Sequence, residues 1–259
     1  MALPVGLGAI RGLLKEVEVS ARDDRPLAVG GARELAAVLR RDLGNGARPG
    51  AIRSDDSPEG AAIYVYVLGR DPDADDEAAL KRARRARVPI VAVVAGPAAD
   101  DLTLPFVLAT DVVRVGAGEG FPLDAIAERI AARLDEDGAP LAARIPLLRN
   151  AVCAQLIASA SRRNAVLAAA VFVPGADLPL LTLNQLRLVL RIAQAHGADV
   201  GRERLPELAA SVGAGIGLRA LARELLDFVP GVGWAVKGAV AYAGTRALGE
   251  AAVRRFAAG

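Results

Sequence analysis

The chain has 259 residues, of which 53% are hydrophobic and 24% charged, so it is long enough for one large domain or two ordinary ones. Aromatic residues make up only 3%, which argues against recognition of single-stranded nucleic acid by base stacking. The single cysteine, Cys153, excludes an intrachain disulfide and a thiolate zinc cluster, and the single histidine, His196, excludes a metal site built on several imidazoles. We therefore expect no metal site, no cofactor and no nucleic-acid partner.

The 32 basic and 30 acidic residues are unevenly distributed along the chain. Residues 1–140 carry 18 basic and 23 acidic side chains, a net charge of −5, whereas residues 141–259 carry 14 and 7, a net charge of +7. This asymmetry predicts two units, of which the second is better suited to an anionic surface.

The first residues indicate an amphipathic helix. The apolar stretch at residues 3–10 is short and is followed by Arg11, Lys15 and Glu16, a pattern unlike a secretory signal. We therefore assign residues 1–24 to an N-terminal helix. No uninterrupted apolar run reaches the 18 residues typical of a membrane span; residues 228–245 come closest, with Lys237 inside them.

Residues 25–139 alternate between apolar runs and helical patterns, which predicts an α/β domain with a parallel sheet covered by helices on both faces. The runs at 62–68 and 88–95 are apolar throughout, as expected of strands buried on both faces. The predicted elements, in chain order, are a strand at 26–29, a helix at 32–43, a strand at 62–68, a helix beginning at Asp71 and Pro72, a strand at 88–95, a third strand region at 106–109 and 112–115, and a helix at 123–134.

The turn after the first strand contains a candidate anion site. Gly30 and Gly31 precede a helix whose first turn carries Arg33, and the backbone amides at a helix start can hold an anion. A tight turn that simply requires glycine is the favoured interpretation. The turn has neither the Lys-Ser/Thr pair of a P-loop nor a G-x-G-x-x-G fingerprint.

The order of these elements, and residues 62–96 in particular, resembles the second half of an Era-like GTPase domain. In that family a strand like residues 88–94 ends in the guanine-reading motif N-K-x-D, but the matching positions here are Ala95, Gly96, Pro97 and Ala98. No D-x-x-G motif for the γ-phosphate is recognised between residues 46 and 60. The resemblance implies a GTPase-like fold, and the missing motifs imply a degenerate domain that neither binds nor hydrolyses GTP.

From Pro140 onward the pattern predicts helices only. They are a helix at 147–173 ended by Pro174 and Gly175, a helix opened by a capping box from Thr182 to Gln185 and stopped at Gly197, a helix at 206–226, and a last helix at 232–256. On the second of these helices we expect Arg187, Arg191 and Gln194 to share the side opposite the core.

Residues 140–259 resemble the helical domain of YcjF-type proteins, the domain of unknown function 697, which also follows Era-like GTPase domains. The supporting motif is P-G-A-D-x-P-x-L-T-x-N-Q, followed by an R-I-A helix that ends in H-G. Its matching residues are Pro174, Gly175, Asp177, Thr182, Asn184, Gln185 and Gly197, and a closing A-Y-x-x-T-x-x-x-G motif matches Tyr242, Thr245 and Gly249. The resemblance implies a bacterial protein associated with the inner membrane, but it implies no reaction.

Taken by themselves, the residues of this half favour packing over chemistry. The small side chains of Ala235, Ala239 and Ala243 recur every four residues, which predicts a close helix–helix approach. A turn or cap is the favoured role for Asp177, and Cys153 is expected to be an inert buried thiol. His196 lies at a helix C-terminus, where its charge suits the helix dipole, so we assign no catalytic residue.

Two functions are compatible with these observations. The first is a non-catalytic adaptor or regulator, in which a degenerate GTPase-like domain (residues 25–139) is joined to a membrane-associated helical domain (residues 140–259). Its expected partners are a membrane surface or membrane protein, with a further protein or a second copy possible. The expected location is the cytoplasmic face of the bacterial inner membrane, with the cytoplasm as the alternative. The second function is a soluble small-ligand or nucleotide-binding protein with an atypical phosphate site at Gly30, Gly31 and Arg33.

Overall fold

The computed structural model describes residues 7–96, 104–116, 118–170, 178–198 and 234–258. The chain divides into two compact units. An α/β unit comprises Asp23–Val152, and a helical unit comprises Met1–Arg22 together with Cys153–Gly259. The N-terminal helix therefore groups with the C-terminal half of the chain.

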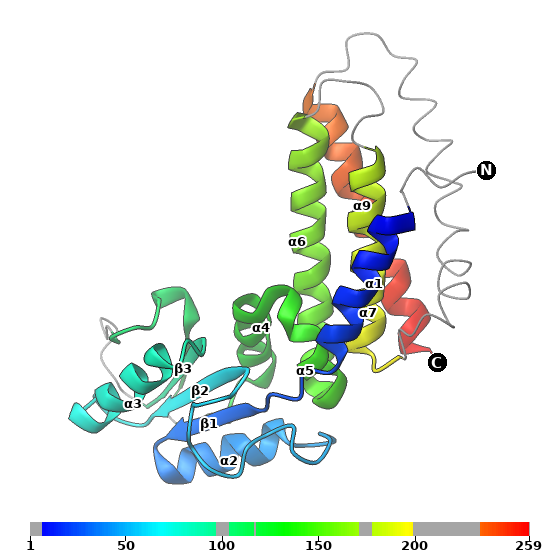
Figure 1. Ribbon diagram of the computed structural model, residues 1–259. Helices are drawn as coiled ribbons and strands as arrows, with labels where there is room; N and C mark the ends of the chain where they lie inside the picture. Colours follow the sequence, from blue (N-terminus) through cyan, green and yellow to red (C-terminus); the bar gives the residue numbers. More distant parts are fainter. Residues whose placement is uncertain (1–6, 97–103, 117, 171–177, 199–233, 259) are drawn as a thin grey trace. The chain divides into compact units, whose positions relative to one another are not determined.

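The α/β unit contains a four-stranded parallel sheet (Figure 1). Its strands are β1 (Leu27–Gly31), β2 (Ile63–Leu68), β3 (Ile90–Ala95) and β4 (Val112–Val115), and they lie side by side in chain order. Every residue of β2 is buried, as expected of a run with no polar side chain other than two tyrosines. The predicted parallel sheet is confirmed.

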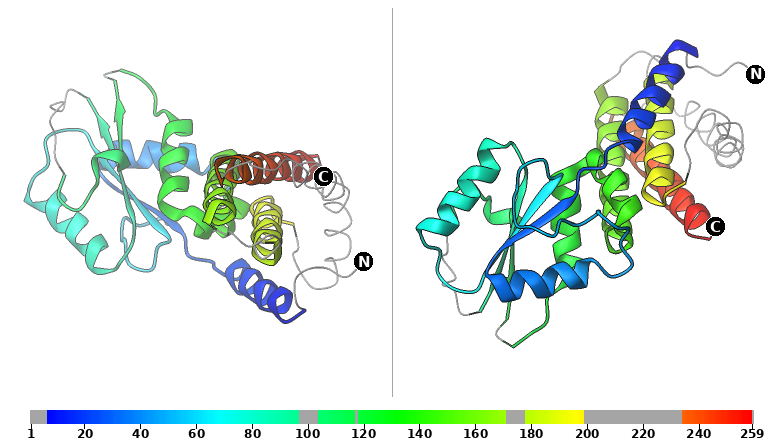
Figure 2. Two further views of the ribbon diagram at one scale, coloured as in Figure 1. Left: turned by 90° about the horizontal axis from the view of Figure 1, so that it is seen from above. Right: turned by 60° about the horizontal axis from the view of Figure 1, so that its bottom comes forward.

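Helices cover both faces of this sheet. Helix α3 (Ala74–Arg85) packs its Ala79, Leu80 and Ala83 against the face that carries Tyr64 and Tyr66. Helices α2 (Arg33–Leu43) and α4 (Leu123–Leu134) contact the strands from the opposite side, as Figure 2 shows.

An isolated parallel bridge between Leu27 and Ile52 explains this arrangement. After β1 the chain forms α2 and then pairs at Ile52 with one edge of β1. It then crosses to the opposite edge of β1, where it forms β2. With right-handed crossovers, this reversal places α2 and α3 on opposite faces. The fold therefore has a topological switch point beside the carboxyl end of β1.

Two details of the α/β unit differ from the sequence-based expectation. Helix α3 begins at Ala74 with Asp73 as its N-cap, so Pro72 lies before the helix and not in its first turn. The capping box that Asp73 forms with Asp76 decides the start. The segment 106–109 is not a strand: Phe106 has φ +67°, and a short 3₁₀ helix follows at Ala109–Asp111.

After α4 the chain forms a 3₁₀ helix (Asp135–Gly138), α5 (Ala139–Arg144) and another 3₁₀ turn (Pro146–Leu148) before α6 (Arg149–Ala170). The helical unit contains most of α6 together with α1 (Leu7–Ala21), α7 (Leu178–Ala195) and α9 (Trp234–Ala257). Helix α7 contacts both α1 and α9, and all its residues from 188 to 195 are buried. No strand occurs after Pro140 in the part of the chain that the structure describes, as predicted.

The two ends of α7 differ in how well the sequence predicts them. Thr182 does not open the helix, because α7 (Leu178–Ala195) already includes the four residues before it. The C-terminal end is as predicted. Gly197 has φ +76°, and the amides of Gly197 and Ala198 donate to the carbonyls of Gln194 and Ala193, which is a Schellman motif.

Three of the motif residues, Pro174, Gly175 and Asp177, and the helix predicted at 206–226 lie outside the described residues. Among the helices that the structure describes, none combines the length and apolar character needed to cross a bilayer.

Candidate functional site

The switch point lies where the chain passes from β1 to α2, and in doubly wound sheets this is the usual place for a ligand. Here β1 ends at Gly31 and α2 begins at Arg33, so Ala32 alone connects them. The amide of Ala32 donates to the carbonyl of Val67 at 2.8 Å, which ties the turn to β2. The backbone amide of the turn itself is therefore already engaged with β2.

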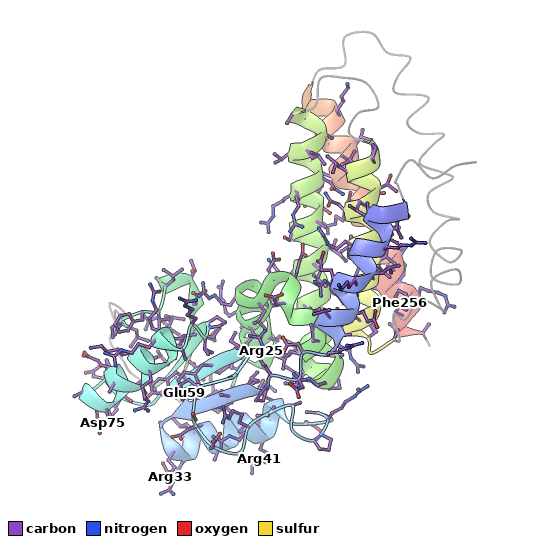
Figure 3. The ribbon with its side chains drawn as sticks, viewed as in Figure 1. Arg25, Arg33, Arg41, Glu59, Asp75 and Phe256 are labelled. Carbon is purple, nitrogen blue, oxygen red and sulfur yellow. The ribbon has the colours of Figure 1, made fainter. Side chains whose placement is uncertain are left out.

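Packing accounts for both glycines of this turn. Gly31 has φ +101°, and a Cβ there would lie 2.0 Å from the carbonyl oxygen of Val67. A Cβ on Gly30 would lie 2.2 Å from the hydroxyl oxygen of Tyr64. Arg33 is exposed, and its side chain extends away from the ribbon (Figure 3). A cavity of about 440 Å³ lies at the opposite end of α2, where Asn45 and Gly46 line it.

A cluster of charged side chains follows β2, the strand beside the switch point. Asp76 is buried and accepts hydrogen bonds from the Tyr66 hydroxyl at 2.7 Å and from Arg70 at 2.9 Å. Burial and the bond to Asp76 raise the pKa of the Tyr66 hydroxyl. Arg70 also binds Asp73, whose pKa is lowered chiefly by the hydrogen bond from the backbone amide of Asp76 and further by Arg70. Because its donors are engaged with these carboxylates, Arg70 stabilises the start of α3.

The helical unit contains a hydrogen-bonded polar layer inside its packed helices. Asn164 of α6 donates to the hydroxyl of Thr245 of α9 at 3.0 Å, and it accepts a bond from Asn184 of α7 at 3.0 Å. Gln185 donates to Thr245 at 3.4 Å, and both Asn164 and Thr245 are fully buried. We call these four residues the polar layer. It contains amides and a hydroxyl and no general base, so its chemistry is that of a link between three helices.

The structure thus brings together three residues of the predicted motif, Asn184, Gln185 and Thr245, in a role that sequence reasoning did not assign. Sequence reasoning placed the two amides in a cap, and it missed Asn164 as the partner of Asn184 and Thr245 as the partner of Gln185. Asn164 directly follows Arg162 and Arg163 in α6, so the local sequence does not distinguish it from an exposed polar residue.

Glycines set the distance between α6 and α9. A Cβ on Gly249 would lie 2.5 Å from Cγ1 of Ile157, and one on Gly238 would lie 3.2 Å from the carbonyl oxygen of Ala165. The predicted close approach between helices is present, but it is formed by the glycines and not by the predicted alanines. Ala239 and Ala243 are exposed, because the buried face of α9 passes through Gly238, Thr245 and Gly249. Tyr242 is half-buried, and the structure does not describe the side chain of Ala235.

A second polar group joins α1 to α7. Glu16 accepts bonds from Arg187 at 2.8 Å and from Arg191 at 3.4 Å, and Arg191 also donates to Ser20 and to Gln194. Arg191 and Gln194 are each only 4% exposed. The expectation that these α7 residues lie opposite the core is therefore wrong for Arg191 and Gln194, whereas Arg187 is partly exposed. Their partners in α1 come from the other end of the sequence, so the periodicity of α7 alone could not identify them.

The thiol and the imidazole of this chain are neighbours. The Sγ atom of Cys153 lies 3.8 Å from Nε2 of His196, and the ring of Phe256 lies 6.5 Å from that of His196. Cys153 is buried, as predicted. Across the described ranges, no group of three or more His, Cys, Asp or Glu side chains is placed to hold a metal ion.

No family model matches the chain, and no curated protein and no solved structure is significantly similar to it.

Proposed function

We propose that this protein is a non-catalytic adaptor or regulator, formed by a degenerate GTPase-like unit and a helical unit that associates with a membrane surface. The observation that carries the proposal is the one-residue connection between β1 and α2. A phosphate-binding loop needs several consecutive backbone amides directed at the ligand, together with a lysine and a hydroxyl. In this chain the amide of Ala32 is already bonded to β2.

The sequence around β3 supports the same proposal. A guanine-reading protein needs an aspartate shortly after this strand, and positions 95–98 read Ala-Gly-Pro-Ala. A domain with this topology but without phosphate and base contacts is better suited to present surfaces to partners than to carry out hydrolysis.

The alternative function is a small-ligand or nucleotide-binding protein with an atypical phosphate site at Gly30, Gly31 and Arg33. The geometry favours it less, because contacts with Tyr64 and Val67 account for both glycines. Arg33 by itself would be a single exposed cation, and an exposed charge pair contributes little binding energy.

The membrane part of the proposal is supported by charge and by exposed apolar side chains. Residues 141–259 carry a net charge of +7, and each basic residue near an anionic surface contributes about 1 kcal/mol. Val166 of α6 is 69% exposed and Leu180 of α7 is 52% exposed. We therefore propose binding at the surface of the bilayer, on the cytoplasmic face of a bacterial inner membrane.

Calorimetric titration tests the nucleotide part of the proposal. The full chain, titrated with GTP or ATP in the presence of Mg²⁺, is expected to give no saturable heat at micromolar nucleotide. A saturable micromolar isotherm that is weakened by Arg33→Ala would establish the alternative function instead.

Vesicle flotation tests the membrane part. The full chain is expected to float with vesicles containing phosphatidylglycerol, to float less as salt rises, and to remain at the bottom with phosphatidylcholine alone. The variant Arg162→Glu/Arg163→Glu changes two exposed residues of α6 and should reduce flotation. The matched control, Arg84→Glu/Arg85→Glu, makes the same charge change on the exposed side of α3. Equal loss in both variants, or no flotation of the unmodified chain, contradicts the proposed helical membrane surface.

A further inference from the structure

We propose that α7 carries an acceptor face for an acidic amphipathic helix of a partner protein, and that α1 occupies this face in the isolated chain. The α7 acceptor face consists of Leu183, Leu186, Arg187, Leu190, Arg191, Ala193 and Gln194. The inference rests on the proposed adaptor function, for which it names the class of partner.

The apolar part of the contact resembles the binding of a helix to a partner surface. Leu13, Leu14 and Val17 of α1 are buried against Leu190 and Ala193 of α7. These α1 positions follow the three- and four-residue spacing of a single helix face. The contact therefore recognises an amphipathic helix by the spacing of its apolar side chains, as in complexes where a helix binds an apolar groove.

The polar part of the contact identifies the charge of the preferred helix. Glu16 is the carboxylate of α1 that binds Arg187 and Arg191, so one negative charge serves two positive ones. Among the residues that the structure describes, the Nε atoms of both arginines and the Nε2 atom of Gln194 are buried without an acceptor. Buried donors without acceptors weaken a contact, so α1 leaves binding energy unused on this face.

Ser20 marks the place where a second carboxylate would fit. It lies one helical turn after Glu16, and its hydroxyl accepts a hydrogen bond from Arg191. Arg191 in turn donates to Gln194. Ser20 therefore lies beside Arg191 and Gln194, which both have a buried donor without an acceptor. A partner helix with acidic side chains at both positions would neutralise both arginines, and it would therefore displace α1.

A second copy of the chain fits this face less well. Its α1 would present the same Glu16 and Ser20, and it would leave the same donors without acceptors. The preferred occupant is therefore a helix of another protein with two acidic residues spaced four apart beside an apolar stripe.

Peptide binding to the full chain tests the proposal. Three fluorescent peptides of residues 7–21 are compared by anisotropy: the natural sequence, a Ser20→Glu peptide and a Val19→Glu peptide. Val19 is 59% exposed, so the last peptide adds the same charge away from the contact. The Ser20→Glu peptide is expected to bind at least tenfold more tightly than the other two. This advantage should disappear in the full-chain variant Arg191→Met, because Arg191 is the residue that contacts Ser20. Equal affinity of all three peptides, or no binding of any, overturns the proposal.

Proteolysis of the intact chain provides a second measurement. Trypsin can cleave α1 after Arg11 and Lys15, and a more firmly bound α1 is cut more slowly. The full-chain variant Ser20→Glu should be cut several-fold more slowly than the natural chain, and Val19→Glu should not. Faster cleavage of Ser20→Glu would mean that the face accepts no second carboxylate.

Two further outcomes separate the possible explanations. A concentration-dependent dimer that the natural peptide dissociates would assign the face to a second copy and overturn the proposed partner class. If the three peptides bind equally well but the full chain still floats with vesicles, only the proposed role of the α7 acceptor face is rejected. Loss of flotation with intact discrimination would reject the membrane part of the proposed function and leave the face in place.

Discussion

The two units bury different kinds of side chain. In the α/β unit the strands bury apolar residues and tyrosines, and the buried charged residues among those described are Asp76 and Asp111, each paired with an arginine. The helical unit buries five polar residues among those described: Ser161, Asn164, Arg191, Gln194 and Thr245. The α/β unit is therefore stabilised mainly by non-directional burial, whereas the helical unit also depends on particular hydrogen-bond partners.

This difference affects how each unit responds to substitution. An apolar sheet tolerates changes that preserve volume, but it does not tolerate an atom placed between two strands. A buried polar layer is sensitive to the loss of one partner, because the remaining groups stay buried without their bonds. The following predictions test this contrast, beginning with the largest expected effect.

Gly31→Ala should be the most destabilising of these changes. The new Cβ would lie 2.0 Å from a backbone oxygen of β2, at a φ of +101° that alanine rarely adopts. We expect a loss of about 3 kcal/mol or more in the free energy of unfolding, measured with urea. Gly60→Ala is the matched control, because Gly60 has φ +73° and open space around its Cβ position. It should lose only about 1 kcal/mol, the strain of the backbone alone.

Asn164→Ala should destabilise the helical unit by about 2 kcal/mol, because it removes a partner from both Thr245 and Asn184. A double-mutant cycle with Thr245→Val, followed by urea unfolding, should give a coupling energy of at least about 0.5 kcal/mol. The exposed Arg162→Ala, also on α6, should change stability by less than about 0.5 kcal/mol. Strictly additive effects in the cycle would mean that the polar layer does not act as a unit.

Two helical glycines should respond to alanine with opposite signs. Gly249→Ala brings a Cβ within 2.5 Å of Ile157 and should destabilise the protein by about 1–2 kcal/mol. Gly12→Ala in α1 meets no atom within 4 Å and should stabilise it by up to about 1 kcal/mol, because alanine is the better helix former. Thermal unfolding of the two variants measures both effects. If Gly249→Ala also raises Tm, the contact between α6 and α9 is looser than the structure shows.

The smallest effect concerns the pH dependence of the α/β unit. The pKa of Asp73 is lowered in the folded state, chiefly by the hydrogen bond from the Asp76 amide. A lowered folded pKa stabilises the protein above the unfolded value of about 3.9, and this contribution is lost as the pH falls through the folded pKa. Asp73→Asn retains a capping side chain but does not titrate there, so its stability should fall less between pH 7 and pH 3.

The difference should be the smallest of these effects, since Asp73 is half-exposed and solvent screens its interactions. Urea unfolding at the two pH values measures it. Asp75→Asn removes a charge from the same turn of α3 and is the control. If both variants change the pH dependence of the free energy of unfolding equally, the effect comes from the helix dipole and not from the capping hydrogen bond.

The sequence was most informative where a pattern is local. The apolar runs of β2 and β3, the helical spacing of α4 and the glycine stop at Gly197 each depend on a few consecutive residues, and the structure confirms them. Helix starts were less predictable. In α3 the N-cap is Asp73, and the predicted start at Asp71 and Pro72 lies before the helix. Helix α7 already includes Leu178, so it does not start at the predicted capping box. Several acidic residues near the start of α3 are compatible with a cap, and the capping box between Asp73 and Asp76 selects Asp73.

Only the tertiary structure decided which side chains meet across long distances in sequence. The sequence by itself determined an α/β unit followed by helices, because hydrophobic periodicity is a property of neighbouring residues. It did not determine that Arg191 binds Glu16, 175 residues away, or that Thr245 meets Asn164, 81 residues away. A polar residue on a helix has the same local pattern whether it faces water or a partner. The partner that makes burial favourable is supplied by another helix, and only folding brings the two together.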